Sequence, residues 1–597
     1  MTYKILMGNE AIALGALHAG VKVVAGYPGT PSTEIIETVA AEKKPGVDVQ
    51  WSTNEKVALE VAAGAAYTGA RSMVTMKQVG LNVAADPLMS LSYIGVRGGM
   101  VIVVADDPGP WSSQTEQDTR HFAKYSNLPV FDPSSPEEAY EMVLEAFALS
   151  EEFALPVFLR PTTRVCHSSA SVKIGEALEH HTAPRFEKKP EWVIFPALSY
   201  RKHGELETKQ SSLSEKFSGI KYNFISGGGA RGVAASGIAW LYAREIIEEH
   251  ELDVTLFKVG TPYPLPEKKA EEFLNAVDAV LVLEELDPVL EEQLLLQTAD
   301  KKPILGKQSG HLPRNGEYSY GIVKDALFKY LGKEPAETEN MTLPQFPVRP
   351  PVLCAGCPHR ASFYEVKAAT ANTAKPIYTG DIGCYTLGNA APLSMVDTCL
   401  CMGAGITQAQ GLALSEPGAK CIAFVGDSTF FHTGIPGVIN AVYQNTDITV
   451  VVLDNHTTAM TGHQPHPGTG RTATGAPAKA LDIETMLRAC GVEKIYTTNP
   501  LNYEASVKIF REAVEFDGPS AVIAKSPCIV HIKKPETVRQ IKREICTGCL
   551  RCIKQLGCPA LFPNGNKASV TESLCTDCGL CTHVCPVGAI KETKRNA

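Results

Sequence analysis

Short apolar runs alternate with helical stretches along the first 185 residues of the chain. The runs predict buried parallel strands, which carry hydrophobic side chains on both faces: VKVVAGYP, RSMVTMK, MVIVVADDPG and PVFLRPTT. Between them lie Ala-rich stretches that predict helices, such as the one from Val57 to Thr68. This alternation of strand and helix predicts an open α/β sheet.

The same alternation recurs in two later parts of the chain. The second part contains KYNFISGGGARG, VTLFKVG and AVLVLEE, and the third covers about residues 350 to 535. A polar stretch, RKHGELETKQSSLSEKFSG, predicts a linker or exposed insertion, and the Pro-rich LPQFPVRPPV predicts a joint. The predicted fold class is α/β, with several open, doubly wound parallel-sheet domains. We expect these segments: a first domain at 1–185, a linker or insertion at 186–220, a middle domain at 221–345, a third domain at 346–540 and a small domain at 541–597.

Eight of the 17 cysteines lie in the last 52 residues, in two copies of one spacing. The second copy, C-x2-C-x2-C-x3-C-P, is the bacterial ferredoxin signature, in which the fourth cysteine binds the other cluster. We therefore expect two [4Fe–4S] clusters and a ferredoxin-type C-terminal domain. One cluster is held by Cys546, Cys549, Cys552 and Cys585, and the other by Cys575, Cys578, Cys581 and Cys558. Paired C-x-x-C is also a zinc pattern, but the third C-x-x spacing fits a cubane better.

Composition narrows the class of protein. With 44% hydrophobic and 20% charged residues the chain is typical of globular proteins, and its net charge of −9 argues against nucleic-acid binding. No run approaches the roughly 20 apolar residues of a membrane span, and the N-terminus is too polar for a secretory signal. The cysteines occur in metal-ligand spacings rather than a disulfide framework, which predicts a cytoplasmic protein.

Two polar turns follow predicted strands in the third part of the chain. Gly-Asp-Ser comes after the strand from Cys421 to Val425, and Asp-Asn-His-Thr after the strand from Ile448 to Leu453. Open α/β sheets bind ligands at these strand ends. Oxygen ligands suit a hard cation that is shared with phosphate oxygens. A plain strand turn rich in small and polar residues is the structural alternative.

The two turns resemble the thiamine diphosphate motif, G-D-G followed further along by N-N. The resemblance implies that the side chains of Asp427 and Asn455 and the carbonyl of Thr457 bind Mg²⁺. It also implies that Gly426 and Ser428 let the backbone approach the diphosphate.

This chain departs from the motif at two positions. Ser428 replaces the last glycine and Asp454 the first asparagine, and neither is an implied metal ligand. CMGAGITQAQGLAL resembles the helix start that follows in these enzymes, where Met402 would hold thiamine in its bent form. A core methionine is the alternative for Met402.

A glutamate that activates the aminopyrimidine ring is expected in the first part of the chain. TNEKVALEVAAGAAYTGARSMV resembles the family pattern H-E-x-x-A-x-x-x-A-x-G-x-A, which implies Glu55 as the activator. A carboxyl group in an apolar pocket has a raised pKa and can exchange protons near neutral pH. Glu60 is the competing candidate, at a spacing that fits less well.

The turn after the first strand, YPGTPST, resembles Y-P-x-T-P-S-T of the 2-oxoacid:ferredoxin oxidoreductases. The resemblance implies that Thr30 contacts the substrate carboxylate, and a strand-to-helix turn with free N–H groups suits an anion. A purely structural N-capping turn is the alternative. Four further cysteines resemble the positions that hold a cluster close to thiamine in the same family, although they could instead be buried small hydrophobes: Cys354, Cys357, Cys384 and Cys528.

Taken over nearly the whole chain, the sequence is similar to that family, and its domain order to the large subunit of the members that act on aryl 2-oxo acids. The implied activity is oxidative decarboxylation of an aryl 2-oxo acid of the indolepyruvate type, with coenzyme A as acyl acceptor and an external ferredoxin as electron acceptor. The gamma-type domain of the pyruvate enzymes is not found, which implies a separate smaller beta subunit and a heterotetramer. The first alternative is a related 2-oxoacid:ferredoxin oxidoreductase that acts on another 2-oxo acid. A non-oxidative thiamine decarboxylase and a non-catalytic electron-carrier subunit are the others.

Overall fold

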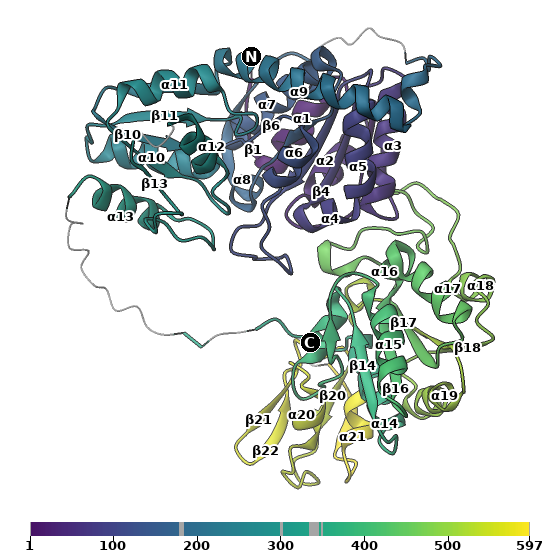
Figure 1. Ribbon diagram of the computed structural model, residues 1–597. Coiled ribbons are helices and arrows are strands. Elements are labelled where there is room, and N and C mark those ends of the chain that lie inside the picture. Colours follow the sequence, from purple (N-terminus) through teal and green to yellow (C-terminus); the bar gives the residue numbers. More distant parts are fainter. Residues whose placement is uncertain (1, 178–183, 299–301, 334–345, 348–349, 596–597) are drawn as a thin grey trace. The chain divides into compact units, whose positions relative to one another are not determined.

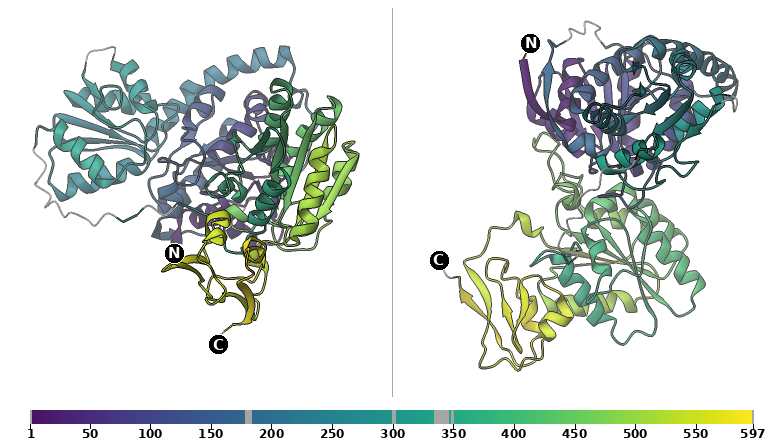
Figure 2. Two further views of the ribbon diagram at one scale, coloured as in Figure 1. Left: turned by 90° about the horizontal axis from the view of Figure 1, so that it is seen from below. Right: turned by 90° about the vertical axis from the view of Figure 1, so that its left-hand side faces the viewer.

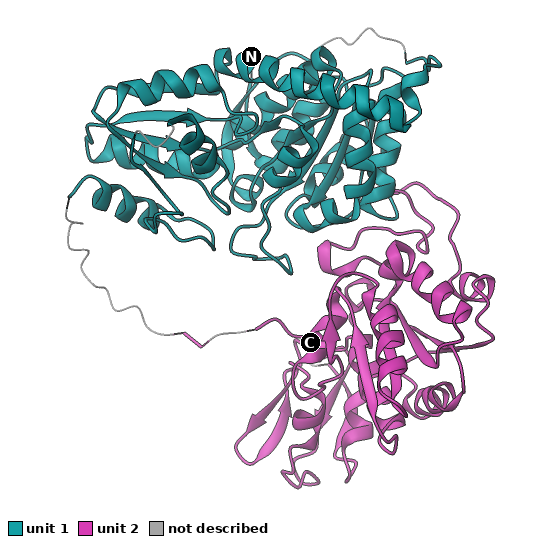
Figure 3. Cartoon of the chain, in the orientation of Figure 1, with its two compact units in different colours: residues 1–343 teal, residues 344–597 magenta. Residues whose placement is uncertain are grey.

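The computed structural model describes residues 2–177, 184–298, 302–333, 346–347 and 350–595. They form two compact units, Met1–Leu343 and Pro344–Ala597, each described by itself below (Figure 3). The division falls at the Pro-rich joint expected from the sequence, half of which lies outside the described residues. Within those residues, every helix is too short or too polar to cross a bilayer.

The first sheet of unit 1 is parallel throughout. Its central strand, β5 (Met100–Ala105), is buried along its whole length, as its apolar sequence predicts. The order across the sheet is β3 (Asp48–Trp51), β2 (Val23–Gly26), β4 (Ser72–Lys77), β5, β7 (Val157–Leu159) and β6 (Val130–Phe131).

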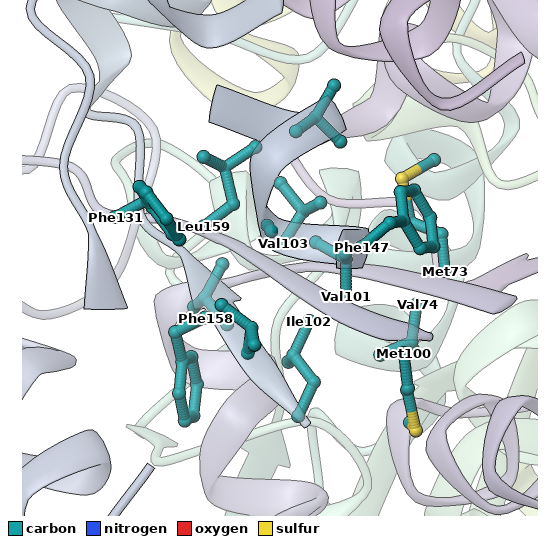
Figure 4. Packing of buried hydrophobic residues seen from close by; sticks show 14 of the residues in the cluster. Met73, Val74, Met100, Val101, Ile102, Val103, Phe131, Phe147, Phe158 and Leu159 are labelled. Carbon is teal, nitrogen blue, oxygen red and sulfur yellow. The ribbon is translucent and has the colours of Figure 1, made fainter. Parts of the chain in front are cut away.

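Helices cover both faces of this sheet (Figure 1). One group consists of α1 (Gly8–His18), α2 (Thr33–Glu42) and α7 (Pro136–Phe153), and the other includes α3 (Glu55–Tyr67) and α5 (Ala85–Ile94). Figure 4 shows Phe147 of α7 packed with Val101 and Val103 of the central strand. The sheet is therefore doubly wound, as predicted. A small antiparallel pair, β1 (Thr2–Met7) with β8 (Ser169–Ile174), lies beside it.

The middle block of unit 1 is a second sheet, parallel except for one edge strand. The order is β13 (Ile304–Leu305), β12 (Ala279–Leu283), β10 (Arg231–Ala235), β11 (Thr255–Val259) and antiparallel β9 (Asn223–Gly227). One face packs against α10 (Gly237–Glu249) and α13 (Tyr320–Tyr330), the other against α11 (Glu267–Ala276) and α12 (Val289–Thr298).

A buried charged side chain connects the middle block to the first. Arg120, on α6 (Arg120–Ser126), is fully buried and donates to Asp118 at 2.5 Å and to Glu284 at 2.6 Å. It also donates to the backbone carbonyls of Glu285 and Asp287, at 2.8 and 2.9 Å. A buried guanidinium is tolerated only when its donors are satisfied in this way. The first and middle blocks therefore belong to one unit.

The stretch expected to be a linker or insertion forms a long helix instead, α9 (Pro196–Gly219). Its Leu206, Leu213 and Phe217 are buried, and Ser214 donates to the carbonyl of Leu265 at 2.7 Å. The helix contacts α5 of the first block and α11 of the middle block. The linker prediction is wrong because this apolar stripe is narrow, so the many polar residues around it hide the helical period.

The sheet of unit 2 has the same winding as the first sheet. Its order is β15 (Thr398–Cys399), β14 (Pro376–Gly380), β16 (Lys420–Gly426), β17 (Ile448–Asp454), β19 (Ser520–Lys525) and β18 (Lys494–Thr498), all parallel. When strands are numbered in chain order within each sheet, both sheets follow 2-1-3-4-6-5. The order reverses next to β14 and β16, and this reversal is where such sheets bind ligands.

The C-terminal domain forms a small lobe of unit 2 (Figure 2, yellow). Two antiparallel pairs, β20 (Thr537–Ile541) with β23 (Ile590–Lys594) and β21 (Leu561–Asn564) with β22 (Lys567–Val570), enclose α20 (Arg551–Leu556) and α21 (Leu580–Val584). Arg360 on α14 (Pro358–Ala369) donates to the carbonyl of Leu556 at 2.5 Å, and Tyr364 donates to Gln555 at 3.2 Å. The lobe is therefore attached to the sheet domain through α14.

Candidate functional site

The carboxyl ends of three neighbouring strands in unit 2 each carry a buried polar side chain. Asp381 follows β14, Asp427 follows β16 and Asn455 follows β17. Parallel strands end at the same edge of a sheet, so the three lie together at the point where the strand order reverses. The sequence prediction included Asp427 and Asn455 but missed Asp381.

Asp427 is held by its own turn and by the next one. The backbone N–H of Ser428 donates to its Oδ1 at 2.9 Å, and the backbone N–H of Asn455 donates to its Oδ2 at 3.2 Å. Burial works to raise the pKa of Asp427, but the contact with His466 and the N–H of Ser428 outweigh it, so the pKa is lowered. Asp427 is therefore a carboxylate, the form that binds a hard cation.

Two histidines that the sequence prediction missed contact the two candidate metal ligands. Nε2 of His466 lies 3.1 Å from Oδ2 of Asp427, and Nε2 of His359 lies 3.3 Å from the amide nitrogen of Asn455. Burial lowers the pKa of His359 to about 4, so its imidazole is neutral, and its Nδ1 has no partner among the described residues. In the sequence, His359 occurs in CPHR and His466 in QPHPG. Neither histidine is part of a spacing pattern, so little in the sequence indicated that they lie in the site.

The turn after β16 is closely packed against Tyr385. A Cβ at Gly426 would lie 2.6 Å from the Tyr385 ring, so only glycine fits there. The Tyr385 hydroxyl donates to Asp381, whose pKa burial raises to about 7. A buried carboxylate and a buried amide oxygen are ligands that suit a hard cation, and the unpartnered ring nitrogen of His359 is a polar group available to a bound ligand, so these residues fit a magnesium diphosphate.

The remaining predicted cofactor residues lie at the same edge. The N–H of Thr457 donates to Oδ1 of Asn455 at 3.1 Å, and the hydroxyl of Ser428 accepts from Thr458 at 3.0 Å. Met402 is half-buried, and its neighbour Gly403 donates its N–H to Asp381 at 3.0 Å. The predicted residues of this motif are thus brought together, and their roles remain predictions.

The four scattered cysteines lie beside this motif. The N–H of Cys528 donates to the carbonyl of Asn455 at 3.0 Å, which joins the cysteine loop to the metal turn. Burial raises the pKa of the Cys384 thiol to about 11, with smaller contributions from Cys528 and Cys354. Burial likewise raises the pKa of Cys357 to about 12, and Cys354 adds to that shift. The four cysteines, although spread over 175 residues of the sequence, are therefore neighbours in space, as a shared cluster would need.

Two cavities in the C-terminal lobe divide its eight cysteines into the two expected groups. One cavity is lined by Cys546, Cys549, Cys552 and Cys585, and the other by Cys558, Cys575, Cys578 and Cys581. The second cavity is also walled by Gly356 and Cys357 of the sheet domain. Among the described residues, no three His, Cys, Asp or Glu side chains are arranged to ligate a single metal ion.

In unit 1, Glu55 is the first residue of α3 and is 5% exposed. A Cβ at Gly80 would lie 2.5 Å from its Oε1, so a larger residue there would displace the carboxyl group. Glu60, the competing candidate, is 48% exposed and forms a surface ion pair with Lys56 at 3.1 Å. The burial of Glu55 supports it over Glu60 as the ring activator.

Thr30 lies at the carboxyl end of β2, and its carbonyl accepts from the hydroxyl of Ser112 at 3.0 Å. Lys77, at the end of β4, donates to the carbonyl of Ser112 at 3.1 Å and lies next to Gly29. Burial lowers the pKa of Lys77. The sequence prediction missed this cation, which stands beside the turn expected to meet a carboxylate.

Known families match three parts of the chain. Residues 14–204 match "Pyruvate flavodoxin/ferredoxin oxidoreductase, thiamine diP-bdg", residues 381–524 match "Thiamine pyrophosphate enzyme, C-terminal TPP binding domain", and residues 568–591 match "4Fe-4S binding domain". These matches confirm the predicted fold class.

Relatives cover nearly the whole chain. Indolepyruvate oxidoreductase subunit IorA of Archaeoglobus fulgidus is 42% identical over 99% of this chain and 98% of its own. The same subunit of Pyrococcus horikoshii is 40% identical over 99% and 97%. A solved structure of 2-oxoglutarate:ferredoxin oxidoreductase from Magnetococcus marinus is similar over 55% of this chain and 65% of its own, with 17% identity and a TM-score of 0.47, too low to add to the argument.

Proposed function

Because the chain belongs to the family of the indolepyruvate oxidoreductase subunit IorA, we propose that it oxidatively decarboxylates aryl 2-oxo acids of the indolepyruvate type. It is an enzyme of the 2-oxoacid:ferredoxin oxidoreductase class that uses thiamine diphosphate and iron–sulfur clusters. In the proposed reaction a 2-oxo acid and coenzyme A yield an arylacetyl-CoA and CO2. Two electrons leave one at a time and reduce two ferredoxins.

One observation carries the proposal. Cys528 donates its N–H to Asn455, so the residues suited to a magnesium diphosphate and those suited to a cluster share a hydrogen bond. Bound thiamine diphosphate supplies the nucleophilic carbon and electron sink for loss of CO2, and a nearby cluster can take electrons singly. A non-oxidative decarboxylase would have no use for this arrangement.

Separate groups of residues are proposed to bind the cofactor and to transfer a proton. Asp427, Asn455 and the Thr457 carbonyl bind Mg²⁺, and His466 and neutral His359 orient the first two. Gly426 and Ser428 let the backbone reach the diphosphate. Glu55, in unit 1, would exchange a proton through its carboxyl oxygen with the aminopyrimidine nitrogen of a bound thiamine diphosphate, as a general acid–base.

The turn after β2 is the proposed binding site for the substrate. Thr30 and the neighbouring cation Lys77 bind the carboxylate of the 2-oxo acid, since an anion is stabilised by a hydroxyl donor and an ammonium group together. The half-buried Met402 would contact the bound cofactor and help to hold it in its bent form.

The cavities support an order for electron transfer through three clusters. The first cluster is bound by Cys354, Cys357, Cys384 and Cys528, beside the metal turn. The second is bound by the Cys558 group, because its cavity shares a wall with Gly356 and Cys357. The third is bound by the Cys546 group, where Cys549 is exposed to solvent.

The partners proposed are a smaller beta subunit, in a heterotetramer, and an external ferredoxin. The relatives are named as subunits, which supports the first, and the exposed end of the cluster series supports the second.

The test is a substrate panel with the complex reconstituted anaerobically. We expect CoA-dependent ferredoxin reduction with indolepyruvate and phenylpyruvate, and rates at least tenfold lower with pyruvate and 2-oxoglutarate. Equal rates with the aliphatic acids would refute the aryl specificity. CO2 release at full rate without an electron acceptor would refute the oxidative reaction.

A further inference from the structure

The C-terminal lobe has the opposite charge to the rest of the chain. Residues 537–595 contain nine Lys and Arg against four Asp and Glu, whereas the whole chain contains 56 against 65. Asp577 and Glu592, two of the four acids, form ion pairs with Arg539. The lobe therefore presents a positive surface on a negative protein.

The basic side chains gather around the cavity of the Cys546 group. Lys542 accepts the N–H of Cys546 on its carbonyl at 2.9 Å, and Lys567 donates to the carbonyl of Arg543 at 2.6 Å. Arg551 begins α20, two residues after Cys549, and Lys591 follows a residue of the cavity wall. Arg543, Arg551 and Lys591 are exposed, and one exposed acid, Glu544, interrupts the group.

An exposed apolar centre lies within this positive surface. Ile545 and Val587 are both 42% exposed and flank the loops of Cys546 and Cys585. Cys549, a ligand of the proposed third cluster, is itself exposed. In contrast, the cavity of the Cys558 group is walled by the sheet domain. Electrons can therefore leave the lobe most directly at Cys549.

We propose that this exit surface, formed by Lys542, Arg543, Arg551, Lys567 and Lys591 around Ile545 and Val587, docks an acidic protein that carries a one-electron cluster, of the ferredoxin type. The proposal rests on the proposed function, which delivers electrons to the third cluster. One electron passes from that cluster to the carrier, and no atom or proton moves between the two proteins.

The positive charge of the exit surface favours an acidic electron carrier as the protein that binds there. Opposite charges steer association and raise its rate by about 10- to 1,000-fold at low salt, and the effect weakens as the Debye length falls. The small apolar centre excludes water at the point of electron transfer, while the basic rim sets orientation. A basic or neutral carrier would gain neither orientation nor rate from this surface.

The test reverses charge at three exposed positions that make no side-chain bond of their own in the lobe's described contacts: Arg543→Glu, Arg551→Glu and Lys591→Glu combined. A matched control reverses three exposed charges on α18 (Ile483–Ala489) and α19 (Tyr503–Glu515) of the same unit: Arg488→Glu, Lys508→Glu and Arg511→Glu. Both variants are assayed as the reconstituted complex, with an acidic ferredoxin and separately with methyl viologen. Binding of oxidised ferredoxin is measured directly by interferometry.

We expect the exit-surface variant to raise the KM for ferredoxin at least tenfold at low salt, to lose its salt dependence and to bind oxidised ferredoxin at least tenfold more weakly. Its viologen-linked rate should be unchanged, because added negative charge does not repel this dication. Unchanged ferredoxin KM and binding would overturn the docking proposal. Wild-type complex that binds ferredoxin but reduces neither acceptor would refute the proposed function and leave the docking surface supported.

Discussion

Arg360 should control how firmly the C-terminal lobe is attached to the sheet domain. Its guanidinium is buried and donates to the carbonyls of Leu556 in the lobe and Leu353 beside the first cysteine loop, both at 2.5 Å. Replacing it with methionine keeps the length of the side chain but removes both donors. Of these two bonds from Arg360, the one to Leu556 crosses from α14 to the lobe, so that bond sets the effect of the substitution.

The magnitude follows from the donor's charge. A hydrogen bond from a charged donor contributes about 1.5–3 kcal/mol, and the Leu556 carbonyl would be left without it. Since about 1.4 kcal/mol corresponds to a factor of ten, opening of the lobe should become about 10- to 100-fold more frequent. Electron transfer between the first two clusters should slow with it, while cofactor and iron content stay normal.

Hydrogen exchange of the reconstituted protein measures this opening, because exchange of protected amides follows the opening equilibrium. We expect faster exchange in α20 and unchanged exchange in β16 and β17. The control is Lys367→Met, since Lys367 lies on the same helix and donates to the carbonyls of Pro392 and Leu393 within the sheet domain. If α20 exchanged equally slowly in both variants, Arg360 would not hold the lobe.

Asp427→Ala should abolish retention of thiamine diphosphate and leave the lobe's clusters intact, and normal cofactor content by fluorescence assay would contradict the metal site. Glu55→Gln should bind the cofactor but lose most turnover, because the amide cannot pass on the proton; a near-normal rate, with Glu60→Gln inactive, would exchange their roles. Three complete cubanes imply about 12 Fe per chain, and Cys384→Ala should remove about four. Eight Fe in both proteins would disprove the first cluster. Glu365 is buried without a hydrogen-bond partner among the described residues, and burial raises its pKa to about 9. The neutral acid is the form that the fold favours, so Glu365 should cost stability increasingly as pH rises from about 5 to 9. Glu365→Gln should therefore raise the melting temperature at pH 8 more than at pH 5, and an equal shift would contradict its burial.

Much of the fold was predictable because its signals are local. Buried parallel strands such as β5 and β17 are continuous apolar runs, and a polar turn at their carboxyl ends marks the site without further knowledge. The cysteine spacings in the lobe are equally local. The crossing of Cys558 and Cys585 between the two groups followed from a ligation rule specific to ferredoxins.

The parts that could not be predicted depend on contacts between distant residues. His466 contacts Asp427, which lies 39 residues earlier in the sequence, and no sequence pattern around either residue indicates this contact. Arg120 reaches Glu284 across 164 positions, which is why the first and middle blocks were expected as separate domains. Strand β10 was missed because its sequence, RGVAA, follows three glycines and resembles a turn.

The hydrogen bond between Cys528 and Asn455 has a consequence for handling the protein in air. Oxygen that reaches the proposed first cluster, one of whose ligands, Cys354, is exposed, would release its iron, and the loop that carries Cys528 would then lose that anchor. The turn that carries Asn455 would loosen with it. A preparation exposed to air should release its vitamin-derived cofactor after its iron, and adding back thiamine diphosphate alone should not restore it. Oxidative damage to the cluster would thus be observed as loss of thiamine diphosphate from the protein.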